Sequence, residues 1–69
     1  MARRTIKTVR VGARCVVRIQ RDAEWDEFVV TTATPVKKWS GMYHTEDKKD
    51  ARNTAAHQIK MIRRAGVCR

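Results

Sequence analysis

The stretch TVRVGARCVVRIQR, residues 8–21, decides the fold, because small or apolar side chains hold every odd position from 9 to 19. In a strand, successive side chains alternate between two faces, whereas a helix would spread these β-branched valines around its whole circumference. Gly12 within the stretch marks either a bulge or a turn. We therefore predict one strand, or a tightly joined pair of strands, with an apolar face and a charged face. The charged face carries Arg10, Arg14 and Arg18.

Positive charge dominates the composition. The 69 residues include 16 Lys and Arg against 7 Asp and Glu, which gives a formal net charge of +9 at pH 7. A field of this size on a small body attracts polyanions and steers association with nucleic acid. The acids form two clusters, at 22–27 and 46–50, so residues 1–21 hold seven basic side chains and no acid.

The size of the chain limits its core. A domain of this length buries only about 60% of the surface that its unfolded chain exposes, so its stability is marginal. A homodimer would bury more surface, and we therefore consider one.

The two cysteines, Cys15 and Cys68, form no CxxC pair and no zinc-ligand spacing with His44 or His57. The N-terminus has no apolar signal-peptide core, and no apolar run approaches the roughly 20 residues of a membrane span. We therefore expect a cytoplasmic protein of a bacterial or phage-infected cell, without membrane contact. Because disulfides are rare in that compartment, we expect both cysteines to be free thiols.

Two more segments favour strands. FVVTTAT, at 28–34, is rich in β-branched residues and is followed by Pro35. The polar segment RDAEWDE, at 21–27, connects it to the opening stretch as a hairpin. VKKWSGMY, at 36–43, predicts a third strand that Gly41 interrupts.

The C-terminal third predicts a helix over 46–64. Thr45 stands at the N-cap position, acids crowd the first turns, and Gly66 suits a C-terminal cap. At 100° per residue, one stripe is apolar and predicted to pack on the sheet. It consists of Ala51, Ala55, Ile59 and Ile62. A separate arc without acids, the basic ridge, consists of Lys49, Arg52, Asn53, Ala56, Lys60, Arg63 and Arg64.

Together these elements predict an α+β fold, a three-stranded antiparallel β-sheet with one C-terminal α-helix packed on one face. Residues 8–66 form the single small domain in this prediction. Residues 1–7 are a flexible basic N-terminal arm, and 67–69 are a C-terminal tail.

Two of the aromatic side chains have two interpretations, as part of the core or as a surface for base stacking. Phe28 and one of Trp39 and Tyr43 are expected in the core, since a small domain needs large side chains to fill its interior. Facing outward beside Lys37 and Lys38, Trp39 and Tyr43 could instead stack on unpaired bases. The core interpretation is favoured.

No pattern of residues indicates catalysis. The sequence contains no recognisable Ser/His/Asp or Cys/His arrangement and no Gly-rich phosphate loop, and its two histidines are isolated. We expect no enzyme activity, no cofactor and no metal site.

The order strand, strand, strand, helix, with WSGMYHT (39–45) followed by EDKKDA (46–51), resembles the three-stranded DNA-binding modules of plant transcription factors and of phage integrase arm-binding domains. The resemblance covers about half of the chain, from Phe28 to Ile62, and consists of general patterning without a specific motif. It implies a sheet that enters the major groove and a helix that supports it. Size and basic charge also resemble small accessory proteins of bacteriophages, including anti-CRISPR and host-takeover proteins.

The favoured function is nucleic-acid binding, duplex DNA ahead of RNA, through phosphate contacts. Sequence readout requires that arginine side chains or Asn53 reach base edges. Asn53 is the one base-reading type on the basic ridge, because its amide can pair with adenine. The candidate contact residues are Arg3, Arg4, Lys7, Arg10, Arg14, Arg18, Lys37, Lys38, Arg52, Asn53, Lys60, Arg63 and Arg64.

The alternative is a protein-binding inhibitor or adaptor that acts on a nucleic-acid-processing protein. An indole among acids in a loop is typical of a contact surface, and it would anchor the partner. This surface consists of Asp22, Glu24, Trp25, Asp26 and Glu27.

Overall fold

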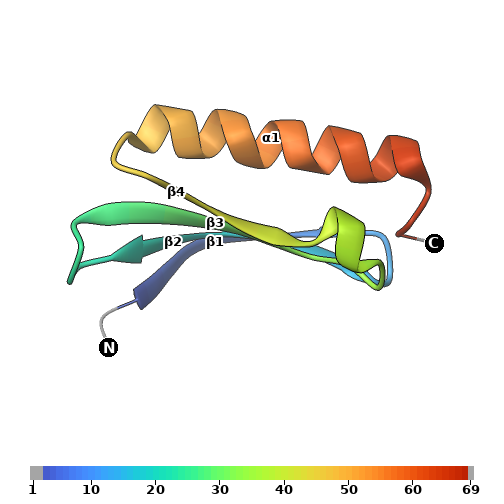
Figure 1. The fold of residues 1–69 in the computed structure, drawn as a ribbon, viewed down its shortest axis with the longest axis horizontal. Helices are drawn as coiled ribbons and strands as arrows, with labels where there is room; N and C mark the ends of the chain where they lie inside the picture. The colour runs from blue at the N-terminus through green and yellow to red at the C-terminus, as the bar shows by residue number, and fades with distance from the viewer. Residues whose placement is uncertain (1–2, 69) are drawn as a thin grey trace.

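The computed structural model describes residues 3–68. The elements follow the order β1 (Arg3–Val11), β2 (Cys15–Asp22), β3 (Glu27–Ala33), a short 3-10 turn η1 (Lys37–Trp39), β4 (Gly41–Thr45) and α1 (Lys48–Ala65). The strands form one antiparallel sheet in the order β1-β2-β3-β4, and α1 covers one of its faces (Figure 1). The prediction of an α+β fold with an antiparallel sheet and a C-terminal helix is confirmed. The strand count is wrong, because the sheet has four strands and not three.

The additional strand arises in the opening stretch, which is a hairpin. Residues 12–14 turn the chain back, and Gly12 takes the left-handed conformation, with a φ of 74°, that glycine adopts without steric strain. Val11 and Cys15 face each other across this turn, so Gly12 marks a turn and not a bulge. The structure extends β1 back to Arg3, so most of the expected flexible arm pairs with β2 instead. Met1 and Ala2 lie outside the described residues.

The connection between β3 and β4 differs from the predicted third strand. Its first half forms η1, and only the part from Gly41 onward is extended. Side chains hold this reversal in place: the backbone N–H of Thr34 donates to Ser40 Oγ at 3.0 Å, and that of Val36 donates to Thr34 Oγ1 at 3.1 Å. Such local hydrogen bonds offer the backbone an alternative to a strand ladder.

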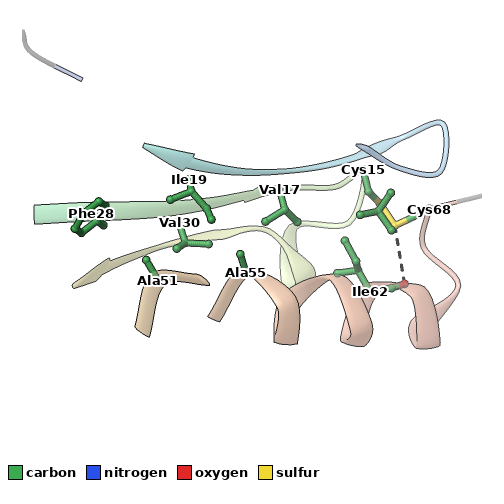
Figure 2. Close-up of a cluster of buried hydrophobic side chains, with 10 residues drawn as sticks. Cys15, Val17, Ile19, Phe28, Val30, Ala51, Ala55, Ile62 and Cys68 are labelled. Atoms are coloured by element: carbon green, nitrogen blue, oxygen red, sulfur yellow. Dashed lines mark hydrogen bonds between the residues drawn. A yellow bond between two sulfur atoms is a disulfide. The ribbon is translucent and has the colours of Figure 1, made fainter. Parts of the chain in front are cut away.

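The core lies between α1 and the face of the sheet that α1 covers (Figure 2). The predicted helix stripe is confirmed, since Ala51, Ala55 and Ile62 are buried and Ile59 packs against them. Small alanines let α1 approach the strands closely. The buried cluster consists of Val11, Cys15, Val17, Ile19, Phe28, Val30, Ala51, Ala55, Ile62 and Cys68.

The N-cap of α1 differs from the prediction, whereas the C-cap agrees with it. Asp47 and not Thr45 is the N-cap, and its side chain accepts from the backbone N–H of Lys49 at 2.9 Å. Thr45 Oγ1 in turn accepts from the N–H of Asp47 at 3.2 Å. Gly66 forms the C-cap in the left-handed conformation, as predicted.

A disulfide joins Cys15 to Cys68, so the expectation of free thiols is wrong. The turn after Gly66 carries Cys68 back over the β1–β2 hairpin, where its Cα lies 5.2 Å from that of Cys15. The approach is so close that a Cβ on Gly12 would lie 2.1 Å from the carbonyl oxygen of Cys68. The free thiols were expected because disulfides are rare in the cytoplasm. Among the described residues, no helix combines the length and apolar character needed to cross a bilayer.

Candidate nucleic-acid interface

The two acidic clusters of the sequence meet at one end of the molecule. The β2–β3 turn and the β4–α1 connection both lie where α1 begins (Figure 1), because two antiparallel strands separate them. We call this the acidic end. It contains Asp22, Glu24, Asp26, Glu27, Glu46, Asp47 and Asp50, which are all the acids of the chain.

Most carboxylates of the β2–β3 turn are engaged within the fold. Asp22 is buried, accepts from the backbone N–H of Glu24 at 3.1 Å, and its Oδ2 lies 3.5 Å from Nε of Arg3. Asp26 pairs with Arg21. On the open face of the sheet, Oε1 of Glu27 lies 2.7 Å from His44 Nδ1. Three of the five residues of the predicted protein-binding surface are therefore engaged within the fold, whereas Trp25 is 70% exposed.

A further bond at the acidic end ties β4 to α1. The hydroxyl of Tyr43 donates to Oδ2 of Asp50 at 2.7 Å. This bond raises the pKa of Tyr43 above its ordinary value, because the neutral hydroxyl is the donor and the carboxylate repels a second negative charge. It lowers the pKa of Asp50, because the ionised carboxylate is the better acceptor.

Among residues 3–68, the opposite end of the molecule carries only basic charge. It combines three segments that are far apart in the sequence: the β1–β2 turn, η1 and the last turns of α1 (Figure 1). We call this the basic end. It contains Arg10, Arg14, Lys37, Lys38, Lys60, Arg63 and Arg64, all of them exposed. Within residues 3–68, none of these seven pairs with a carboxylate.

The predicted row of strand arginines does not lie along one strand. Arg10 belongs to β1, opposite Val16, and Arg18 belongs to β2, opposite Thr8. The two are diagonal neighbours on the open face of the sheet, at a Cα spacing of about 7–8 Å. Arg14 lies in the turn at the basic end. The prediction that these three arginines form one row along a strand is wrong, because the chain reverses at residues 12–14.

The other predicted contact residues are spread over the molecule. Arg3 pairs with Asp22. A register shift between Thr5 and Lys7 turns Lys7 toward α1, where it lines a groove with Arg52. Arg4 lies opposite Arg21, whose guanidinium carbon is 5.1 Å from the centroid of the Phe28 ring.

The basic ridge of α1 is exposed along its length, as its arc predicts. Arg52 and Asn53 lie in its first half, toward the acidic end. Lys60, Arg63 and Arg64 lie in its second half, at the basic end. The role of Asn53 in base readout stays a prediction.

Beside the basic end, a pocket of about 420 Å³ opens between β4 and the second half of α1. Trp39 and Tyr43 line it; Trp39 also packs against the core, while Tyr43 is 43% exposed. Gly41 lies between them in the sequence and also lines the pocket. A Cβ at this position would meet nothing within 4 Å, so the absence of a side chain leaves the pocket open there. Within residues 3–68, no group of three or more His, Cys, Asp or Glu is arranged to hold a metal ion.

Comparison of the chain with protein-family models, with curated proteins and with solved structures gave no match in any of the three. The resemblance to three-stranded DNA-binding modules therefore stays a prediction. The geometry of the two ends carries the functional argument.

Proposed function

We propose that the protein binds the phosphate backbone of nucleic acid, DNA ahead of RNA, through its basic end. One observation carries the proposal: the fold gathers seven exposed cations from three chain segments, while all the acids lie elsewhere. A merely solvated surface would mix charges of both signs. Unpaired cations at one end are what release counterions from a phosphate backbone.

The separation of charge also favours a defined orientation. The longest axis of the molecule measures 35 Å. The seven exposed cations of the basic end lie at one end of this axis, and all the acids lie at the other, where further lysines and arginines accompany them (Figure 1). Such a distribution steers the basic end toward a polyanion, because at the other end the acids offset the cations.

The test is the affinity for a labelled random-sequence duplex as NaCl rises from about 50 to 200 mM. Six or more phosphate contacts should weaken binding by at least about 10³-fold over this range. The double variant Lys37→Ala/Lys38→Ala, in η1, should weaken binding and reduce the salt slope by about two units.

The chain offers a matched control at the acidic end. Lys48 and Lys49 are also adjacent and exposed, so Lys48→Ala/Lys49→Ala makes the same change of net charge. This variant should change the salt slope far less. Equal losses in both double variants would mean that net charge alone acts, and undetectable binding of both the duplex and a single strand at 50 mM NaCl would overturn the proposal.

A second candidate is binding to a nucleic-acid-processing protein through Trp25. Its support is the exposed indole of the β2–β3 turn, which the fold does not use for packing. Trp25→Ala separates the two functions, because it should leave duplex binding unchanged and remove the anchor for a protein partner.

A further inference from the structure

The pocket between β4 and α1 has two walls and a floor from different elements. Val30 and Thr32 of β3 form the floor, Trp39 and Tyr43 form one wall, and α1 forms the other wall with His57, Gln58 and Met61. Its volume of about 420 Å³ lies within the range of about 300–1,000 Å³ that is typical of small-molecule sites.

The chemistry of the lining suits a flat group with polar edges. Trp39 and Tyr43 supply aromatic surface, and Met61 supplies aliphatic surface. Thr32, His57 and Gln58 add hydrogen-bonding groups, and none of the described residues that line the pocket carries a carboxylate. The Tyr43 hydroxyl is held by Asp50 at 2.7 Å, so its ring is fixed before any ligand arrives.

The pocket adjoins the basic end. Lys38 lines it, and its Nζ lies 5.9 Å from the centroid of the Trp39 ring. Arg64 shares a helical stripe with His57 and Met61, because these residues are spaced by four and three positions. A group held in the pocket would therefore have the cation of Lys38 beside it, and Arg64 would lie one helical turn beyond Met61.

From these features we infer that the pocket receives an unpaired nucleobase, so that the bound nucleic acid contains a single-stranded stretch. The inference rests on the proposed function and specifies its ligand. A paired base is stacked within its duplex and cannot enter such a pocket, whereas an unpaired base stacks readily on aromatic side chains. The groove on the β1 side of α1 is smaller, about 180 Å³, and none of the described residues that line it is aromatic.

The test uses the fluorescence of Trp39. The chain has two tryptophans, so Trp25→Phe leaves Trp39 as the single reporter. This variant is titrated at 50 mM NaCl with a ten-residue oligothymidylate, a duplex of equal length and a base-free deoxyribose-phosphate oligomer. We expect the oligothymidylate to quench Trp39 and to bind about 5- to 150-fold more tightly than the base-free oligomer.

Gly41 allows the pocket to be closed without strain in the backbone. A side chain at this position enters open space, so Gly41→Leu should fill the mouth of the pocket. This variant should bind the oligothymidylate and the base-free oligomer equally and lose the quenching. Gly41→Ala, which adds only a methyl group, should behave as the parent protein.

The outcomes separate the two proposals. Equal, salt-dependent binding of oligothymidylate and base-free oligomer without quenching would overturn the pocket inference and leave phosphate binding intact. Preferential binding of the duplex would likewise overturn the pocket inference and leave phosphate binding intact. Absence of binding to all three ligands would overturn both. The comparison among ligands needs only the Trp25→Phe protein, so it holds even where Gly41→Leu does not fold.

Discussion

Different interactions stabilise the two ends of this molecule. At the acidic end, Arg3 with Asp22, Arg21 with Asp26 and His44 with Glu27 join neighbouring segments, and Tyr43 donates to Asp50. At the basic end, the described residues offer no carboxylate, so the charges there only repel one another. That end is joined by the Cys15–Cys68 disulfide and by the close backbone approach at Gly12.

This difference shows how a small domain can keep an unpaired cationic surface. Mutual repulsion of exposed cations opposes folding, and the chain is too short to offset it with a large core. A covalent link at the same end supplies stability that does not depend on charge. The cations thereby stay available for a polyanion.

The largest effect should follow from loss of the disulfide. Cys15→Ala/Cys68→Ala opens a loop with a sequence separation of 53 residues, and loop-closure entropy predicts a loss of about 4 kcal/mol in the free energy of unfolding. Guanidinium unfolding measures this loss. Reductant should reproduce it in the parent protein and have no effect on the double variant. Amide exchange that rises equally at both ends would show that the disulfide does not stabilise the basic end in particular.

A smaller effect should follow from Gly12→Ala. The φ of 74° costs a residue with a side chain about 1–2 kcal/mol, and the new Cβ would also displace the carbonyl of Cys68. We expect a lower thermal midpoint. Gly41→Ala is the matched control, because its Cβ meets nothing within 4 Å, and it should change the midpoint little. Equal midpoints for both variants would show that the approach at Gly12 is not needed.

The smallest effect should come from Tyr43→Phe at the acidic end, and it should depend on pH. The lowered pKa of Asp50 means that its contribution is present above its ordinary value of 3.8 and is lost as the pH falls through the lower folded pKa. The raised pKa of Tyr43 means that its contribution is present below 10.0 and is lost as the pH rises through the higher folded pKa.

The difference in thermal midpoint between Tyr43→Phe and the parent should therefore be constant near neutral pH and shrink on either side. Thermal unfolding at intervals from about pH 2 to pH 11 measures it. An undiminished difference at pH 2 would mean that the ring, and not its hydroxyl, joins β4 to α1.

The helix was predictable because its signals are local. Ala51, Ala55 and Ile62 recur at helical spacing, and Gly66 ends the helix by its own conformation. The hairpin at Gly12 was not, because three turn residues separate Val11 from Cys15 and the alternation of odd positions passes through the turn unchanged. Period two alone cannot tell one long strand from two short ones.

The candidate site was predictable only in part. The two acidic clusters lie in connections that two antiparallel strands separate, so any such sheet brings them to the same end. The basic end depends on the turn that carries Arg14 and on η1, which carries Lys37 and Lys38. The disulfide depends on the path of the chain after Gly66, and no spacing in the sequence encodes that path.

The disulfide also decides how the molecule would respond to mechanical force. Tension applied between the start of β1 and the segment after Cys68 would pass from Cys15 directly to Cys68. Strands β2 to β4 and α1 lie within the closed ring and would carry none of it. Only the chain from Arg3 to Cys15 could be peeled from the sheet, which gives an extension of at most about 45 Å. Stretching would therefore stop early in the oxidised protein, and reduction would let the whole chain unravel.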